Sequence, residues 1–164
     1  MIVHRQTKEH YPVDFHPLTP FDVSTMIRDG SLFSWELQFD WTLYFRFYNI
    51  EVYKMVIRGD DEIQGCIAFE VKEDHIYVHL IESAPHNFKG RAFELIGEHL
   101  FGFACKCSED LGFEGAVAFQ SKIGPKSVPL MNYYVNRIKA EHLGNGYMII
   151  DGPSAKQLIM IYST

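Results

Sequence analysis

The chain has 164 residues, of which 47% are hydrophobic and 22% charged, which predicts one globular domain spanning residues 1–164. Its net charge of −6 disfavours nucleic acid as a partner, because such binding depends on basic contacts to phosphate. No apolar run reaches the roughly 18 residues of a membrane span, so we expect no membrane partner. Three cysteines without framework spacing indicate reduced thiols and a cytoplasmic location. Nothing in the sequence indicates an oligomeric state.

The first half of the chain predicts helices followed by strands. Thr19-Pro20-Phe21-Asp22 has the cap, the proline and the acid of a helix start, and this helix is expected to end near Asp29-Gly30. A second helix is expected within residues 31–49, where Trp41, Tyr44, Phe45 and Tyr48 recur at helical spacing. An antiparallel meander is expected from three closely joined strands at residues 52–57, 63–71 and 75–81.

The second half predicts alternating helices and strands. Residues 90–111 carry an apolar stripe at helical spacing, and Gly112 is a natural C-terminal cap. The apolar run within residues 114–120 suits a buried strand, which after a crossover helix is most simply parallel to the preceding one. A helix is expected at residues 127–138, and Gly144-Asn145-Gly146 predicts a hairpin between residues 140–143 and 147–150. A closing helix suits residues 155–162, although residues 158–161 could equally form a strand.

The segment before the long helix has the features of an anion site. A helix that starts at Gly90 would leave backbone N–H groups unpaired at the positive end of its dipole. Gly90 would let a pyrophosphate approach the backbone, and Lys89 and Arg91 add positive charge. The alternative is that Gly90 only permits a tight turn and that Lys89 and Arg91 are solvated.

This order of elements resembles that of the GNAT-type N-acetyltransferases. In that family the loop after the fourth strand reads Gln/Arg-x-x-Gly-x-Gly/Ala and holds the pyrophosphate of acetyl-CoA. Asn87-Phe88-Lys89-Gly90-Arg91-Ala92 fits the glycine and the alanine and departs from the pattern at Asn87. The resemblance implies an α+β fold (α/β three-layer) with a mixed, mostly antiparallel central sheet flanked by helices. It also implies acetyl-CoA as co-substrate, bound by these six residues, with Asn132 touching the pantetheine arm.

Acetyl transfer to an amine requires a base for the amine and benefits from an acid for the leaving thiolate. In the family a carboxylate on the central strands often serves as the base, which implies Glu82 at the end of the third meander strand. The alternative for Glu82 is a strand end in water. No metal is expected, because His75 and His79 lie about 13 Å apart on a strand and cannot share an ion.

The acid in the family is often a tyrosine on the helix after the fifth strand. The resemblance implies Tyr134, which shares the apolar stripe of its helix, ahead of Tyr133. The family often has a Gly-Phe pair a few residues later, where this chain has Arg137-Ile138-Lys139-Ala140. The alternative for Tyr134 is a core residue with a satisfied hydroxyl.

The expected function is an N-acetyltransferase that moves an acetyl group from acetyl-CoA to a small-molecule or peptide amine by direct transfer. A non-catalytic acetyltransferase-like domain that binds a ligand or a protein is the alternative, favoured by Asn87 and by the missing Gly-Phe pair. A third and less favoured alternative is an unrelated α+β binding domain. The aromatic segment 33–48 either forms a helix core or, by the resemblance, lines the acceptor site. Cys66, mid-strand with no base in view, is expected to be a core residue.

Overall fold

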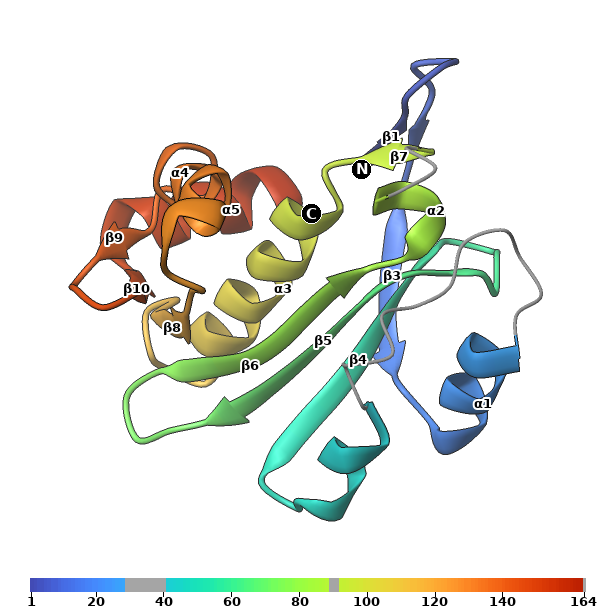
Figure 1. Ribbon diagram of the computed structural model, residues 1–164. Coiled ribbons are helices and arrows are strands. Elements are labelled where there is room, and N and C mark those ends of the chain that lie inside the picture. The colour runs from blue at the N-terminus through green and yellow to red at the C-terminus, as the bar shows by residue number, and fades with distance from the viewer. Residues whose placement is uncertain (29–40, 89–91, 164) are drawn as a thin grey trace. The chain divides into compact units, whose positions relative to one another are not determined.

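The computed structural model describes residues 1–28, 41–88 and 92–163 (Figure 1). Its backbone divides into two compact units, Met1–Ala68 with Leu80–Gly97 and Phe69–His79 with Glu98–Thr164. Whether the chain is a single domain stays a prediction. Two strands, β5 (Ile63–Val71) and β6 (Ile76–Ser83), contribute residues to both units. The strand orders are β3-β4-β5-β6-β8-β10-β9 in a seven-stranded sheet and β2-β1-β7 in a three-stranded one.

The first unit begins with three strands that the sequence patterns do not predict. β1 (Ile2–His4) pairs antiparallel with β2 (His10–Tyr11) and also with β7 (Phe93–Glu94). β3 (Val13–Pro17) pairs antiparallel with β4 (Ile50–Ile57) at the edge of the larger sheet. These N-terminal strands have two to five residues, too few for a clear alternation of polar and apolar side chains.

Helix α1 (Pro20–Arg28) starts where the cap residues predict. The backbone N–H of Asp22 donates to Thr19 Oγ1 at 3.1 Å, and the backbone N–H of Thr19 donates to Asp22 Oδ2 at 2.9 Å. Lys54 Nζ on β4 donates to Asp22 Oδ1 at 2.8 Å and ties the helix start to the sheet. Burial raises the pKa of the Asp22 carboxyl, but the hydrogen bonds from Lys54 and Thr19 outweigh it, so this pKa lies below its usual value.

Replacing Asp22 by Asn is expected to lower the free energy of unfolding at neutral pH by about 1 kcal/mol, because the charge that pairs with Lys54 is lost. The Asn side chain keeps an oxygen that accepts the hydrogen bond of the cap. Because the pKa of Asp22 is lower in the folded than in the unfolded state, its carboxylate stabilises the folded protein at pH values above the usual carboxyl pKa. This stabilisation is lost as the pH falls through the folded-state pKa. Urea unfolding of both proteins between pH 7 and about pH 3 measures the difference. A difference that stays constant with pH would contradict the ion pair as its source.

The described part of the second predicted helix is of another type. Trp41–Arg46 forms a 3₁₀ helix, η1, while residues 31–40 lie outside the described residues. Trp41 is buried, but Phe45, Phe47 and Tyr48 are exposed. The core cluster of this unit contains residues from α1, η1 and the neighbouring strands, namely Leu18, Val23, Met26, Trp41, Val52, Cys66 and Ala68.

The prediction that the long helix begins at Gly90 was wrong. Helix α3 (Ile96–Asp110) begins later, after a single-turn helix α2 (Pro85–Phe88) and β7. Lys89, Gly90 and Arg91 lie outside the described residues. Phe93, which fits the apolar stripe of the helix, instead pairs with His4 of β1, and its ring packs edge-on against the rings of His4 and Tyr11. Pairing with the N-terminal strand therefore takes this residue out of the helix.

The second unit follows the predicted order. β8 (Val117–Gln120) is parallel to β6, as expected of a crossover through a helix. Gly112 ends α3 with a φ of +88°, the conformation expected of a C-terminal cap. The predicted helix and hairpin are present as α4 (Val128–Asn136), β9 (Glu141–His142) and β10 (Tyr147–Ile150), and the closing segment is the helix α5 (Gly152–Tyr162).

The architecture confirms the predicted α+β class with a mixed sheet and flanking helices (Figure 1). The β3–β4, β8–β10 and β9–β10 pairs are antiparallel, and the β6–β8 pair is parallel. None of the helices in the described part of the chain is long and apolar enough to cross a membrane.

Candidate functional site

Glu82, the predicted base, lies near the end of β6 in the first unit and is buried, with 8% of its surface exposed. The indole Nε1–H of Trp41 donates to Glu82 Oε1 at 2.7 Å, and Trp41 is 2% exposed. The alternative of a carboxylate in water therefore does not hold. The sequence gives no sign of this hydrogen bond, because the partners are 41 positions apart and no local signal connects them.

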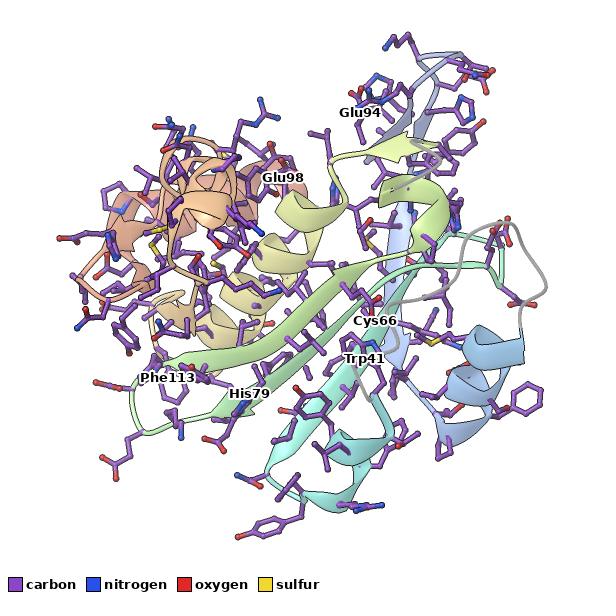
Figure 2. All side chains as sticks on the ribbon, in the orientation of Figure 1. Trp41, Cys66, His79, Glu94, Glu98 and Phe113 are labelled. Carbon is purple, nitrogen blue, oxygen red and sulfur yellow. The ribbon has the colours of Figure 1, made fainter. Side chains whose placement is uncertain are left out.

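Cys66 lies in the same core cluster as Trp41 (Figure 2). It is fully buried, and burial raises the pKa of its thiol well above the usual value, with the charges of Glu82 and Asp22 acting in the same direction. The nearby charge of Lys54 opposes this rise. Because a thiol must ionise to act as a nucleophile, Cys66 is a core residue, as the sequence predicts.

Asn87 fixes the two ends of the segment that carries the coenzyme motif. Its side-chain Nδ2 donates to the backbone oxygen and to Oε1 of Gln64 on β5, both at 3.0 Å. Its Oδ1 accepts a hydrogen bond from the backbone N–H of Phe93 at 3.0 Å, and the N–H of Ala92 donates to the oxygen of His86 at 2.9 Å. Asn87, the residue that departs from the family motif, thus connects β5 to Phe93 through its short side chain.

Tyr134 on α4 packs against apolar rings within the second unit. Its ring lies 4.8 Å from that of Phe119 on β8 and 5.8 Å from that of Phe101 on α3, in both cases edge-on. Burial raises the pKa of Tyr134, so its hydroxyl keeps the proton at neutral pH. Among the described residues no hydrogen-bond partner of this hydroxyl is found, which leaves it able to donate.

Tyr133 has a different environment from that of its neighbour. Burial raises its pKa, and the Glu98 carboxylate, which accepts a hydrogen bond from its hydroxyl, raises it further. Glu98 itself lies in the first turn of α3 and is 5% exposed (Figure 2). Its Oε1 lies 3.7 Å from Arg137 Nη2. The place of Glu98 in the first turn is not evident from the sequence, whose pattern predicts a helix that begins at Gly90 instead of Ile96.

The other predicted site residues occupy separate positions. Asn132 is exposed on α4, and Phe88 ends α2. Within residues 1–28, 41–88 and 92–163, no three His, Cys, Asp or Glu side chains lie as ligands of one metal ion.

Comparison with solved structures finds acetyltransferases of the GNAT type. The ribosomal-protein-S18-alanine N-acetyltransferase from Escherichia coli is 11% identical with a TM-score of 0.55, over 84% of this chain and 91% of that one. A chimera of the spermidine N-acetyltransferase SpeG from Vibrio cholerae and hSSAT is 11% identical with a TM-score of 0.56, over 90% and 98%. A Bacillus subtilis acetyltransferase in complex with CoA is 12% identical with a TM-score of 0.52, over 87% and 99%.

These likenesses show the fold. The chain has the fold of GNAT-type N-acetyltransferases, which confirms the resemblance drawn from its order of elements. No protein-family model matches the sequence, and a search of curated proteins finds no match.

Proposed function

We propose that this chain is a cytoplasmic N-acetyltransferase that moves an acetyl group from acetyl-CoA to the amine of a small molecule or peptide by direct transfer. The observation that carries the proposal is the buried Glu82 carboxylate on β6, held by the Trp41 indole, in a chain of this fold. Solved structures of the same fold support it: one contains CoA, and the names of two others give spermidine and ribosomal-protein alanine as acceptors.

In this reaction Glu82 accepts a proton from the acceptor ammonium, directly or through water, so that the amine becomes a nucleophile. The amine nitrogen then attacks the thioester carbonyl, and the C–N bond forms as the C–S bond breaks. The Tyr134 hydroxyl gives its proton to the departing coenzyme A thiolate, and the second proton that the nitrogen loses as the amide forms returns to the tyrosinate through water. Their surroundings suit both residues to these roles, because a buried carboxylate gains from taking a proton and a half-buried tyrosine with a raised pKa holds its proton until a strong base forms.

We assign the coenzyme to residues 87–92, with Asn132 at the pantetheine arm. Lys89 and Arg91 carry positive charge, and Gly90 has no side chain that would keep a pyrophosphate from the backbone. Phe88 borders them, and Asn87 and Ala92 act by fixing the ends of the segment through Gln64, Phe93 and His86. Because α3 begins at Ile96, the binding groups are those of the segment itself and not of a helix start at Gly90.

Replacing Gly90 by Glu is expected to abolish acetyl-CoA binding in calorimetry, because the new side chain adds bulk and negative charge where the pyrophosphate would lie. Gln157→Glu is the matched control, since it adds the same charge at an exposed position of α5 and should leave binding unchanged. Circular dichroism should show both variants folded. Absence of binding to the wild type at millimolar ligand would overturn the coenzyme assignment.

The second candidate function is a non-catalytic acetyltransferase-like domain that binds a ligand or a protein. Two observations favour it: Asn87 is committed to hydrogen bonds with Gln64 and Phe93, and α3 starts late with an acid, Glu98, in its first turn. A turnover screen separates the candidates and should include spermidine, an alanine-terminated peptide and a set of aromatic amines. Coenzyme binding without turnover of any amine would establish this second function.

A further inference from the structure

Trp41 and Glu82 form a buried pair that links two distant parts of the first unit. Trp41 is the first residue of η1, and its indole N–H donates to the carboxylate at the end of β6 at 2.7 Å. A distance of this length is typical of a hydrogen bond to a charged oxygen. The indole also packs against Tyr44, with ring centroids 6.0 Å apart, so its orientation is set by the aromatic segment.

We propose that Trp41 is a positioning residue, which holds the Glu82 carboxylate in one orientation and favours its charged form. This rests on the proposed role of Glu82 as the base. An apolar ring of similar size would fill the same space in the core cluster, but it would offer the carboxylate no donor. Loss of this one donor disfavours the charged form of a carboxylate at this depth, so that a larger fraction would be protonated and unable to accept a proton from the amine.

Cys66, a titratable group near Glu82, is itself acted on by charged groups from two further elements. Cys66 on β5 interacts with the Glu82 charge, and Asp22 on α1 and Lys54 on β4 also act on the Cys66 thiol. Lys54 and Asp22 bind each other at 2.8 Å and largely cancel, and the buried thiol stays neutral. The indole N–H contacts the carboxylate directly and favours its charged form.

The contact is tested first without reference to catalysis, by ¹⁵N–¹H NMR of the indole groups. The chain has two tryptophans, and Trp41→Phe identifies the Trp41 signal by its loss. In the wild type this signal is expected to shift with pH as Glu82 titrates, and Glu82→Gln should abolish that shift while the second signal is unaffected. If the chemical shift of the Trp41 signal changed neither with pH nor in Glu82→Gln, the proposal would be overturned.

The positioning role is tested by the pH dependence of kcat/KM for Trp41→Phe. Loss of a hydrogen bond to the charged form raises the pKa of a carboxyl, so the acidic limb of the profile should move up by about one to two pH units. The same substitution in a Glu82→Gln background should have little further effect, because Trp41 acts through Glu82. The proposal would be overturned if the acidic limb of the Trp41→Phe profile did not move, or if the two substitutions lowered kcat/KM by the product of their separate effects. Either result would show that Trp41 has a packing role only.

The two ideas fail in distinguishable ways. If the NMR contact is present but no coenzyme binds and no amine is acetylated, the proposed function fails, and the positioning of a base fails with it. If turnover is found and only the Trp41→Phe profile is unchanged, the function stands and the positioning role alone is overturned.

Discussion

Replacement of Glu82 by Gln is expected to lower kcat/KM for acetyl transfer by roughly ten- to ten-thousand-fold, the range that acid–base catalysis contributes. Gln keeps the volume of the side chain and an oxygen that accepts the Trp41 indole N–H at the Oε1 position, but it cannot take a proton. Affinity for acetyl-CoA should be unchanged. The loss should be largest at neutral pH and should narrow at alkaline pH, where free amines lose their proton to water.

Steady-state kinetics of the wild type and of Glu82→Gln across pH 6–10 measure this effect, with coenzyme affinity followed by calorimetry. Glu73→Gln provides a matched control, because this glutamate is exposed between β5 and β6 and its replacement should leave the kinetics unchanged. An identical pH–rate profile in wild type and Glu82→Gln would assign the base to another residue or to bulk water.

Tyr134→Phe is expected to fold normally, to bind acetyl-CoA with near-normal affinity and to lose turnover by roughly a hundred- to ten-thousand-fold. Phenylalanine keeps the ring that packs against Phe101 and Phe119 and removes only the hydroxyl. Because burial raises the Tyr134 pKa, the wild-type hydroxyl should remain protonated and active to above the usual tyrosine pKa of about 10.

Tyr133→Phe is the matched control for this experiment, since it deletes the same group from the adjacent residue. That hydroxyl binds Glu98, so its loss should cost about 1 kcal/mol of stability and change turnover little. Reversed phenotypes would move the acid role to Tyr133. Full activity in both variants would return Tyr134 to the role of a core residue.

The regular elements of this fold could be predicted where their signals are local. The Thr19–Asp22 cap, the Gly112 cap after α3 and the Gly144-Asn145-Gly146 turn each lie within a few consecutive residues. Such signals reflect hydrogen bonds and backbone conformations of neighbouring residues, so they can be recognised without knowledge of the rest of the chain. The order of elements follows from them and was sufficient to predict the α+β fold.

The sequence by itself thus determined α1, the strands β4, β5, β6 and β8, the helix α4 and the position of Glu82 at a strand end, whereas it left the closing segment open between a helix and a strand. Only the tertiary structure decided that Ile2–His4 pairs with Phe93–Glu94, which delays α3 to Ile96. It likewise decided that Trp41 reaches Glu82 and that Asn87 reaches Gln64. These contacts join residues that are far apart in sequence or lie on different strands. Their partners are selected by burial and hydrogen-bond satisfaction once the elements have packed, so no local sequence pattern predicts them.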